Sequence, residues 1–539
     1  MTAFALDSFA SMAADDRAHN VQASTWAAPP LSAIIGAMVM GTLILLIACF
    51  NLTNTAIATS SKRLKEIGIR KVMGSKRTHL ILQFIGETMS ICFLALLLGI
   101  CLTDLLIEGW NIMTMDMLRL SHNYLENPAF ILFLICVLIF TGIVAGSYPA
   151  FYISKFKPVT ILKGKVKFGG TNYFTRVLLG LQFTICLIAL VSAIGFFQNA
   201  MYQREYDLGF DIRGSVIARV NNEGEFETYR NALTSNPEIL SVAGANSSIF
   251  ANRQHEAIKH ESREVDVDII SVGEIYLQTM GLKLLQGRDF IKDSKTDQGE
   301  SIIITEKMVD LFDWTNPIGK EVIWRDSTRL FVIGVIKDVY TMGLWREMEP
   351  MMIRYISPSE YSQIVVSAKA EHVLSVNTFM REQWNKTFPN RLYNGRMLVS
   401  DLHEVLDLNI NIMYMYAFLG LVALVLSATG LFTLVSLNVI KRMKEIGVRK
   451  VLGASMLNVT RIINTEFLVI LGLACLLGSV ASFNWCNIIM ATIWKYYQGV
   501  NAMTLIAAIT VLFTVSFMII GYKILVVAMM NPIKTLRDE

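Results

Sequence analysis

Seven long apolar stretches divide the chain, and each is long enough to cross a lipid bilayer as a helix. A spanning helix needs about 20 mostly apolar residues. The stretches lie at about 31–57, 80–107, 128–150, 177–199, 411–438, 463–491 and 503–527. The pattern predicts a polytopic α-helical membrane protein with about seven transmembrane helices.

The region between the fourth and fifth stretches has a different pattern, in which short strand-like and helix-like runs alternate. Strands are expected at 264–272, 301–305 and 330–336, where polar and apolar residues alternate or β-branched residues cluster. Helices are expected at 223–235 and 371–386, and turns at Gly287 and 316–319. We therefore expect one compact α/β extracytoplasmic domain at 201–409.

The composition agrees with a membrane protein. Mean hydropathy is +0.47 and only 17% of residues are charged, whereas soluble globular chains have about a quarter. The net charge of +4 is too small to indicate nucleic-acid binding. The expected surroundings are the lipid bilayer and protein partners.

Lysine and arginine are distributed unevenly among the loops. The loops at 61–79, 151–176 and 439–462 are rich in both residues, whereas those at 108–127 and 492–502 hold one each. Because basic loops stay in the cytoplasm, we expect the three basic loops and the C-terminal tail there. The N-terminus and the α/β domain are then expected on the far side.

The chain contains an internal repeat. Residues 62–74 read KRLKEIGIRKVMG and residues 441–453 read KRMKEIGVRKVLG, so ten of thirteen positions are identical at a shift of 379 residues. The same shift pairs Gly41 with Gly420, Glu87 with Glu466, and Gly99 with Gly478. The chain is therefore an internal duplication, as many membrane transporters are.

The two copies are not equally complete. The second has a leading helix, the large domain and three more helices, whereas the first has three helices and the polar segment 1–30. We expect either a fragment or mis-assigned start, or a lineage that lost this half; the fragment is the favoured interpretation.

The repeated basic segment is expected to form a short charged helix on the cytoplasmic face. Its acidic residue stands four positions from basic residues on both sides, which supports an exposed helix, and a glycine is placed to end it. The segment could only set topology and touch anionic lipid. We favour a docking helix, because lipid binding does not explain the repeated Glu and Gly, and two such helices suit a two-fold symmetric partner. The docking residues are Arg63, Lys65, Glu66, Gly68, Arg70, Lys71 and Gly74, with Arg442, Lys444, Glu445, Gly447, Arg449, Lys450 and Gly453.

Two acidic residues, Glu87 and Glu466, occupy matched places in the first turns of a membrane helix. Ionisable groups are costly there unless they are paired. We expect both to pair with the basic docking helix, and a proton relay is the less favoured alternative.

At these residues the sequence resembles the MacB/FtsX-like ABC transporter permeases. The pattern R-x-K-E-I-G-[IV]-R-K-[VIM]-[LM]-G-[AS] is characteristic of that family and stands at 63–75 and 442–454. Further resemblance lies at 158–163, 276–290, 316–320, 333–338 and 531–537, and duplicated permeases of this kind look most like those of Bacteroidetes-type bacteria. This chain departs from the family plan in lacking the first leading span and the first extracytoplasmic domain.

The resemblance implies a mechanism and a domain plan. A separate ATP-binding subunit, acting as a dimer, would bind ATP and Mg²⁺ and couple to the docking residues, so that its closure drives export or extraction at the periplasmic face. A periplasmic or outer-membrane partner is possible, and some relatives are signalling scaffolds for a periplasmic hydrolase or sensor. The implied domains are 1–30, an extracytoplasmic remnant; 31–165, the first FtsX-like repeat; 166–200, a helix opening the second repeat; 201–409, the MacB-like periplasmic domain; and 410–539, the second FtsX-like repeat.

Other chemistry is not expected in the chain itself. It has no G-x-x-x-x-G-K-[ST] phosphate loop, since Lys320 follows Gly319 but precedes Glu321, so we expect no ATPase activity and no directly bound cofactor. His255 and His260 are five residues apart, which does not place them on one helical face, and no metal site is expected.

Overall fold

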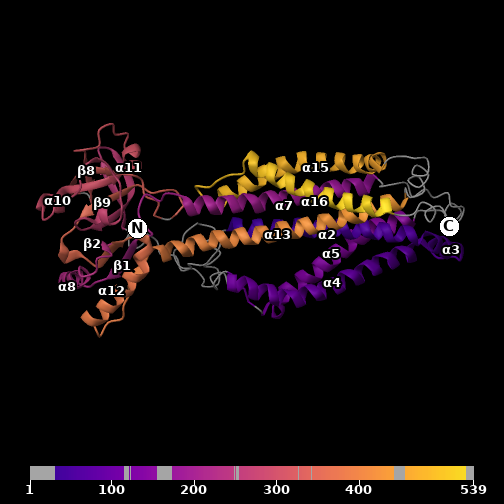
Figure 1. Cartoon of the computed structure of the whole chain (residues 1–539), viewed down its shortest axis with the longest axis horizontal. Coiled ribbons are helices and arrows are strands. Elements are labelled where there is room, and N and C mark those ends of the chain that lie inside the picture. The colour runs from indigo at the N-terminus through magenta and orange to yellow at the C-terminus, as the bar shows by residue number, and fades with distance from the viewer. Residues whose placement is uncertain are drawn as a thin grey trace. The chain divides into compact units, whose positions relative to one another are not determined.

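The computed structural model describes residues 31–113, 120–121, 123–154, 173–247, 249, 254–325, 327–341, 343–441 and 456–529. The chain divides into two compact units. The helical unit comprises Met1–Ala200, Ile410–Ile493 and Gln498–Glu539, and the sheet unit comprises Met201–Asn409 with Trp494–Tyr497. Figure 1 labels their elements.

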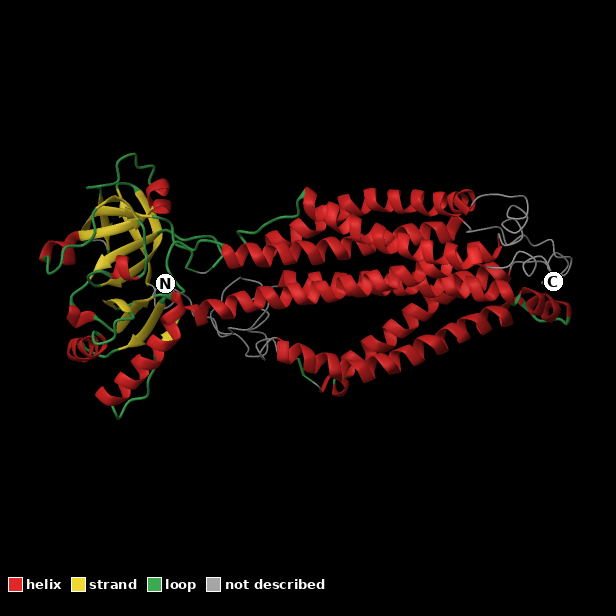
Figure 2. Cartoon of the chain, viewed as in Figure 1, coloured by secondary structure: helices red, strands yellow, loops and turns green. Residues whose placement is uncertain are grey.

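Seven helices are long and apolar enough to span a membrane, which confirms the predicted spans. They are α2 (Leu31–Lys62), α4 (Arg77–Met113), α5 (Pro128–Ser154), α7 (Tyr173–Glu205), α13 (Leu398–Lys441), α15 (Met456–Ile493) and α16 (Ala502–Met529). A short helix, α3 (Leu64–Val72), follows α2, and the 3₁₀ turn η1 (Asn123–Glu126) joins α4 to α5. Helix α7 runs through the second-half bundle in Figure 2.

The second half of the helical unit has its own apolar core. Leu179, Phe183 and Leu187 of α7 are buried against residues of α13, α15 and α16. Helix α7 is the most buried of the seven spans, whereas α4 is almost uncovered. The two halves therefore pack differently although their sequences repeat.

The sheet unit begins with a four-stranded antiparallel sheet in the order β11-β1-β10-β2. Its strands are β1 (Ser215–Arg219), β2 (Ile239–Ala245), β10 (Gln363–Ala368) and β11 (Arg396–Met397). The helices α8 (Glu223–Leu233) and α12 (Val373–Thr387) pack on it around Tyr229 and Trp384, whose rings meet edge to face at 5.1 Å. A single pairing, Ala245 with Val272, joins this sheet to the remaining strands.

Six further strands close into a ring in the order β4-β3-β7-β8-β6-β9 and back to β4. They are β3 (Gln254–His260), β4 (Arg263–Val272), β6 (Ser301–Thr305), β7 (Glu321–Trp324), β8 (Thr328–Ile336) and β9 (Met351–Tyr355), and β5 (Leu284–Gly287) adds to β8. Ile258, Val267, Ile302, Val332 and Met352 are buried in one cluster contributed by five of these strands. Side chains fill the ring, as they do in small closed barrels.

The sequence predictions for this unit are confirmed. The three predicted strands are present as β4, β6 and β8, and the two predicted helices are present as α8 and α12, with α12 preceded by a 3₁₀ turn at Ala370–His372. Gly287 and Gly319 have φ of +80° and +83°, which explains glycine at both turns. Residues 494–497, which lie between the last two spans of the second repeat, group with the sheet unit in the structure.

A buried carboxylate fixes the loop before β6. Asp297 is 1% exposed and accepts two hydrogen bonds of 2.8 Å from Arg288, and others from Ile291 N and Ser301 Oγ. The hydrogen bond from Arg288 is the largest cause that lowers the pKa of Asp297 from 3.8 to about 2.

We predict that Asp297→Asn lowers the local stability of this loop by about 2 kcal/mol, because charge-assisted hydrogen bonds are lost and Arg288 loses its partner. Since the folded pKa is depressed, the contribution of Asp297 is present above about pH 4 and is lost as the pH falls towards 2. Hydrogen exchange of residues 291–301 in the full chain measures this opening. The exposed neighbour Asp293→Asn is the control, and an equal effect of both changes would contradict the assignment.

Candidate functional site

The first copy of the repeated basic segment forms α3, as predicted. Helix α2 ends at Lys62, and Arg63 has φ −98° and ψ 12°, outside the helical geometry. Ile67 N then donates to Arg63 O at 3.1 Å and starts the new helix. The chain therefore changes direction at Arg63.

Gly74 ends α3 in the way the sequence predicted. Its φ is +94°, Gly74 N donates to Lys71 O, and Ser75 N donates to Arg70 O at 3.0 Å. This six-to-one bond is the Schellman arrangement, which a left-handed residue allows. The glycine at this place in the repeat is thus explained by backbone geometry.

Ion pairs and an amide hold α3 against the start of α4. Glu66 accepts from Arg70 at 2.6 Å and from Arg63 at 3.4 Å, and Arg63 also reaches Glu87 of α4 at 3.1 Å. Gln83 of α4 donates to Glu87 and accepts from Arg70 at 2.9 Å. The pairing expected for Glu87 with the basic helix is therefore present.

Two further cations bind the end of α5. Lys71 Nζ donates to Ser154 O at 2.7 Å, and Arg77 Nε donates to Ser154 Oγ at 3.1 Å. Burial, followed by the neighbouring Arg77, lowers the pKa of Lys71. Ile67 is 5% exposed and packs with Leu80. Apolar contacts and hydrogen bonds therefore both hold α3 in place.

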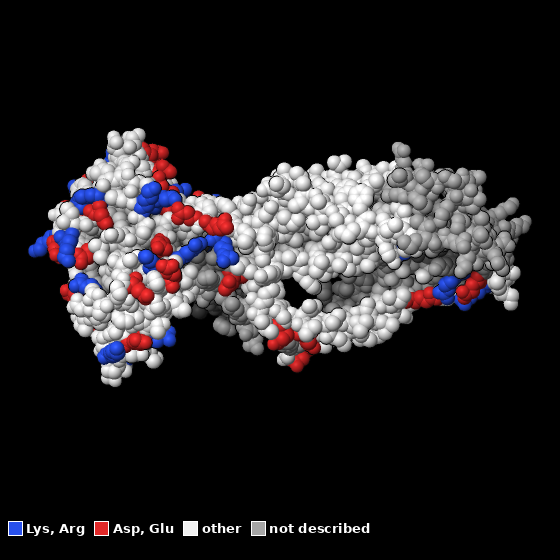
Figure 3. Space-filling view, viewed as in Figure 1, with Lys and Arg blue, Asp and Glu red and all other residues white. Residues whose placement is uncertain are grey.

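The opposite face of α3 is apolar and uncovered. Ile69, Val72 and Met73 are 55%, 61% and 83% exposed. Figure 3 shows an acidic group of side chains on the lower edge of the helical unit and a separate group of both signs around α3. An exposed apolar patch rimmed by charge is typical of a protein interaction site.

The predicted site residues have different roles in this geometry. Glu66 pairs with Arg70 within α3 and with Arg63 just before it, Gly68 is buried, and the backbone at Lys65 is helical. The second copy lies outside the described residues, so the positions expected at Arg442, Lys444, Glu445, Gly447, Arg449, Lys450 and Gly453 stay predictions.

Glu466 pairs with an arginine of α7. Its carboxylate accepts from Arg176 at 2.7 Å, and its side chain is mostly buried. The docking segment expected as its partner lies outside the described residues, so that pairing stays a prediction.

The sequence missed a junction inside the sheet unit. Trp494 is buried and donates through Nε1 to Asn409 Oδ1 at 3.0 Å, and Asn409 donates to Gln203 at 2.6 Å. Lys495 N and Tyr496 N both donate to Leu344 O at 3.1 Å. Residues 494–497, in the loop between α15 and α16, are therefore part of the sheet unit. Aromatic residues on both sides of a lone Lys in a loop were the available signal.

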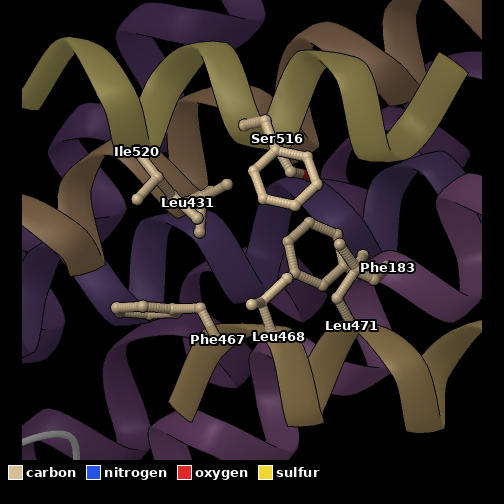
Figure 4. Close-up of a pocket in the computed structure, with 8 residues that line it drawn as sticks. Phe183, Leu431, Phe467, Leu468, Leu471, Ser516 and Ile520 are labelled. Atoms are coloured by element: carbon tan, nitrogen blue, oxygen red, sulfur yellow. The ribbon is translucent and has the colours of Figure 1, made fainter. Parts of the chain in front are cut away.

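The second-half bundle contains an apolar pocket with no room for a water molecule. It is lined by side chains such as Phe183 and Phe467 (Figure 4). Its one hydroxyl, Ser516 Oγ, already donates to Leu512 O. Among the described residues, no His, Cys, Asp and Glu group could hold a metal ion.

The fold and the site define a multi-pass membrane protein. Its helical region is an internal repeat, and an α/β domain is inserted between α7 and α13. Comparisons with known proteins agree with this class. The FtsX-like permease C-terminal model matches residues 38–158 and 417–532, and the MacB-like periplasmic core domain model matches residues 178–375. The chain belongs to the MacB/FtsX-like ABC transporter permease family and is a multi-pass inner-membrane protein.

Relatives match parts of the chain at low identity. The macrolide export ATP-binding/permease protein MacB of Aggregatibacter actinomycetemcomitans is 24% identical over 325 residues, 56% of this chain and 48% of that protein. MacB of Neisseria gonorrhoeae is 26% identical over 238 residues, 41% of this chain and 35% of that protein. The uncharacterized ABC transporter permease YknZ of Bacillus subtilis is 24% identical over 227 residues, 40% of this chain and 56% of that protein. The chain thus spans less than half the length of these two MacB proteins.

One solved structure similar to the chain is the periplasmic region of MacB from Actinobacillus actinomycetemcomitans. It is 18% identical, with a TM-score of 0.28, and the match covers 38% of this chain and 97% of that structure.

The buried contacts of Ile67 in α3 give a direct prediction. Ile67→Ala removes a buried side chain and should lower the free energy of opening α3 by about 2 kcal/mol. Ile69→Ala, on the exposed face, should leave it within about 0.5 kcal/mol. Hydrogen exchange of residues 64–74 in the purified full chain separates the two, and equal effects would contradict the orientation of α3.

The junction at Trp494 gives a second prediction. Trp494→Ala should lower the free energy of opening the 494–497 loop by about 3 kcal/mol, because an aromatic side chain leaves a packed site and Asn409 loses its donor. Lys495→Ala removes only an exposed ion pair with Glu347 and should cost less than about 1 kcal/mol. Hydrogen exchange of the loop amides measures both, and a loop that exchanges freely in the unaltered protein would refute the attachment.

Proposed function

We propose that this chain is the permease subunit of an ABC transporter, in which a separate ATP-binding subunit docks on the cytoplasmic face and drives export or extraction at the periplasmic face. The observation that carries the proposal is α3. It is held at three points to α4 and α5, and it presents Ile69, Val72 and Met73 outward. A docking element needs both firm attachment to the neighbouring helices and an uncovered apolar face.

The basic character of the α3 loop supports its placement in the cytoplasm. The residues that hold α3 also connect it to the spans, since Arg63 reaches Glu87 of α4 and Lys71 reaches the last residue of α5. A displacement of α3 would therefore act on two membrane helices, without passing through a flexible linker.

The route to the sheet unit runs through continuous elements. Helices α7 and α13 each cross the boundary between the two units without a break, and the loop after α15 belongs to the sheet unit. Movement in the bundle can reach that unit through three chain segments in the second half. The absence of a phosphate loop in residues 1–539 supports an ATPase on a partner that would bind ATP and Mg²⁺.

Transport is favoured over the signalling alternative, because two of the relatives are named as macrolide exporters.

Docking is tested by replacing the exposed face of α3. Full-length chain is purified from its native membrane with a non-hydrolysable ATP analogue, and co-purifying proteins are searched for a phosphate-loop sequence. We expect such an ATPase with the unaltered chain, and at least about a tenfold loss of it with Ile69→Asp combined with Met73→Asp, because hot-spot truncations cost about 2 kcal/mol or more.

The matched control is Leu125→Asp, which alters an exposed apolar residue in η1, at the other end of the α4–α5 hairpin. It should leave the amount of ATPase unchanged. Loss with Leu125→Asp but not with the α3 variant would place docking at the wrong end of the hairpin and refute the proposal.

A further inference from the structure

Three strands of the ring in the sheet unit, β3, β7 and β9, each carry near one end a side chain that differs from the apolar filling. These side chains are Glu256, Trp324 and Arg354, and each stands two positions from an apolar residue buried in the ring. Residues two apart on a strand point to the same side of a sheet. The three side chains therefore point inward, and their contacts show that they meet at one end of the ring.

Glu256 holds two neighbouring groups in place. Its carboxylate accepts a hydrogen bond from Trp324 Nε1 at 2.6 Å, and two from Arg325, at 2.9 Å from Nε and 2.6 Å from Nη2. The hydrogen bond from Arg325 is the largest cause that lowers the pKa of Glu256. Glu256 and Arg325 therefore neutralise each other, and Glu256 also fixes the edge of the indole ring.

Arg354 shares the indole but not the carboxylate. Its Cζ atom lies 4.1 Å from the centroid of the Trp324 ring, and Cζ of Arg325 lies 4.3 Å from it. Within the described chain, no residue forms an ion pair or a hydrogen bond with the guanidinium of Arg354. We call this end of the ring the ring mouth, formed by Glu256, Trp324, Arg325 and Arg354.

The surroundings of Arg354 favour the arrival of a negative charge. Burial is the largest cause that lowers the pKa of Arg354, and the neighbouring Arg325 acts in the same direction. Glu360 and then Glu256 act in the opposite direction, but Glu360 is exposed and forms no ion pair with Arg354. A partly buried cation beside a second cation is stabilised when an anion binds it.

The chemistry of the ring mouth indicates the class of anion. A guanidinium stacked on an aromatic ring keeps its N–H donors free in its own plane, where they match the two oxygens of a carboxylate. Because Glu256 already cancels the charge of Arg325, one unpaired cation is left. It suits a singly charged carboxylate better than a phosphate group, which carries a charge of about −1.5 to −2 at pH 7.

We propose that the ring mouth binds a carboxylate group on an acidic polypeptide segment, with Arg354 as the bidentate donor. The side chain of Arg325 is 57% exposed, so the mouth is open to solvent. A small acid would make few other contacts on such a surface, whereas a polypeptide makes more of them around the same carboxylate. This site lies in the sheet unit and does not depend on docking at α3.

The site is tested with a defined probe. Full-length chain in phosphatidylcholine nanodiscs is titrated with a labelled peptide in which aspartate and glycine alternate. We expect saturable binding that the matched asparagine–glycine peptide does not show. Arg354→Gln should weaken binding at least about tenfold, because charge-assisted hydrogen bonds are lost. Arg354→Lys should restore only part of it, since lysine keeps the charge without the planar fork.

The matched control is Arg329→Gln. Arg329 belongs to the same β7–β8 hairpin, but its side chain is 74% exposed and pairs with Glu321 at 3.3 Å. It neighbours Leu330, which is buried in the ring, and therefore points away from the mouth. Binding should stay within about twofold of the unaltered chain. Equal loss in both variants, or no saturable binding at all, would overturn the proposal.

Glu256→Gln separates binding from a structural role of the cluster. The change removes a negative charge from the mouth and releases Arg325, so the aspartate peptide should bind about threefold more tightly. Hydrogen exchange of residues 321–336 verifies that the ring is retained. Weaker binding to a retained ring would contradict the role given to the two arginines.

Competition at pH 7 and matched ionic strength tests the class of anion. Acetate should displace the aspartate peptide at a lower concentration than inorganic phosphate does. Stronger displacement by phosphate would refute the assignment to carboxylates.

Discussion

The pairing of an acidic side chain of a long apolar helix with an arginine is the interaction that ties α4 and α15 to neighbouring elements. Glu87 and Glu466 occupy matched positions, and each would be costly in lipid without a cation. Arg63 meets the first at 3.1 Å and Arg176 meets the second at 2.7 Å. Each pair ties a membrane helix to a neighbouring element of the chain, and the first pair also fixes α3, which the proposed function requires to be rigid.

The duplication makes the chain its own comparison. Equivalent residues face different surroundings: Gly478 meets Leu187 of α7, whereas Gly99 meets nothing. In the second half α7 also supplies Arg176, which pairs with Glu466 at 2.7 Å. The presence of α7 beside one half therefore brings both a close packing partner and an ion pair to that half.

Features set by local pattern were predicted from the sequence. The seven spans follow from length and apolarity, β6 follows from its β-branched run at 301–305, and the end of α3 follows from Gly74. Features set by distant partners were not. The ring closes through the parallel pairing of β4 with β9, about 80 residues apart in sequence, and no local pattern encodes it. Residues 494–496 could not be assigned to the sheet unit, because Asn409, which accepts from Trp494, and Leu344, which accepts from Lys495 and Tyr496, lie far away along the chain. The pairing of Glu466 with Arg176 was missed because the basic docking segment was the nearer candidate in sequence.

The claim that α3 is the docking element is tested most directly by hydrogen exchange of the full chain with and without its ATP-binding partner. Protection confined to residues 66–74, with the amides of η1 unchanged, is the result that the structure predicts. Binding of the ATPase with no change in α3 would contradict the account, because the exposed apolar face at Ile69, Val72 and Met73 would then remain in solvent.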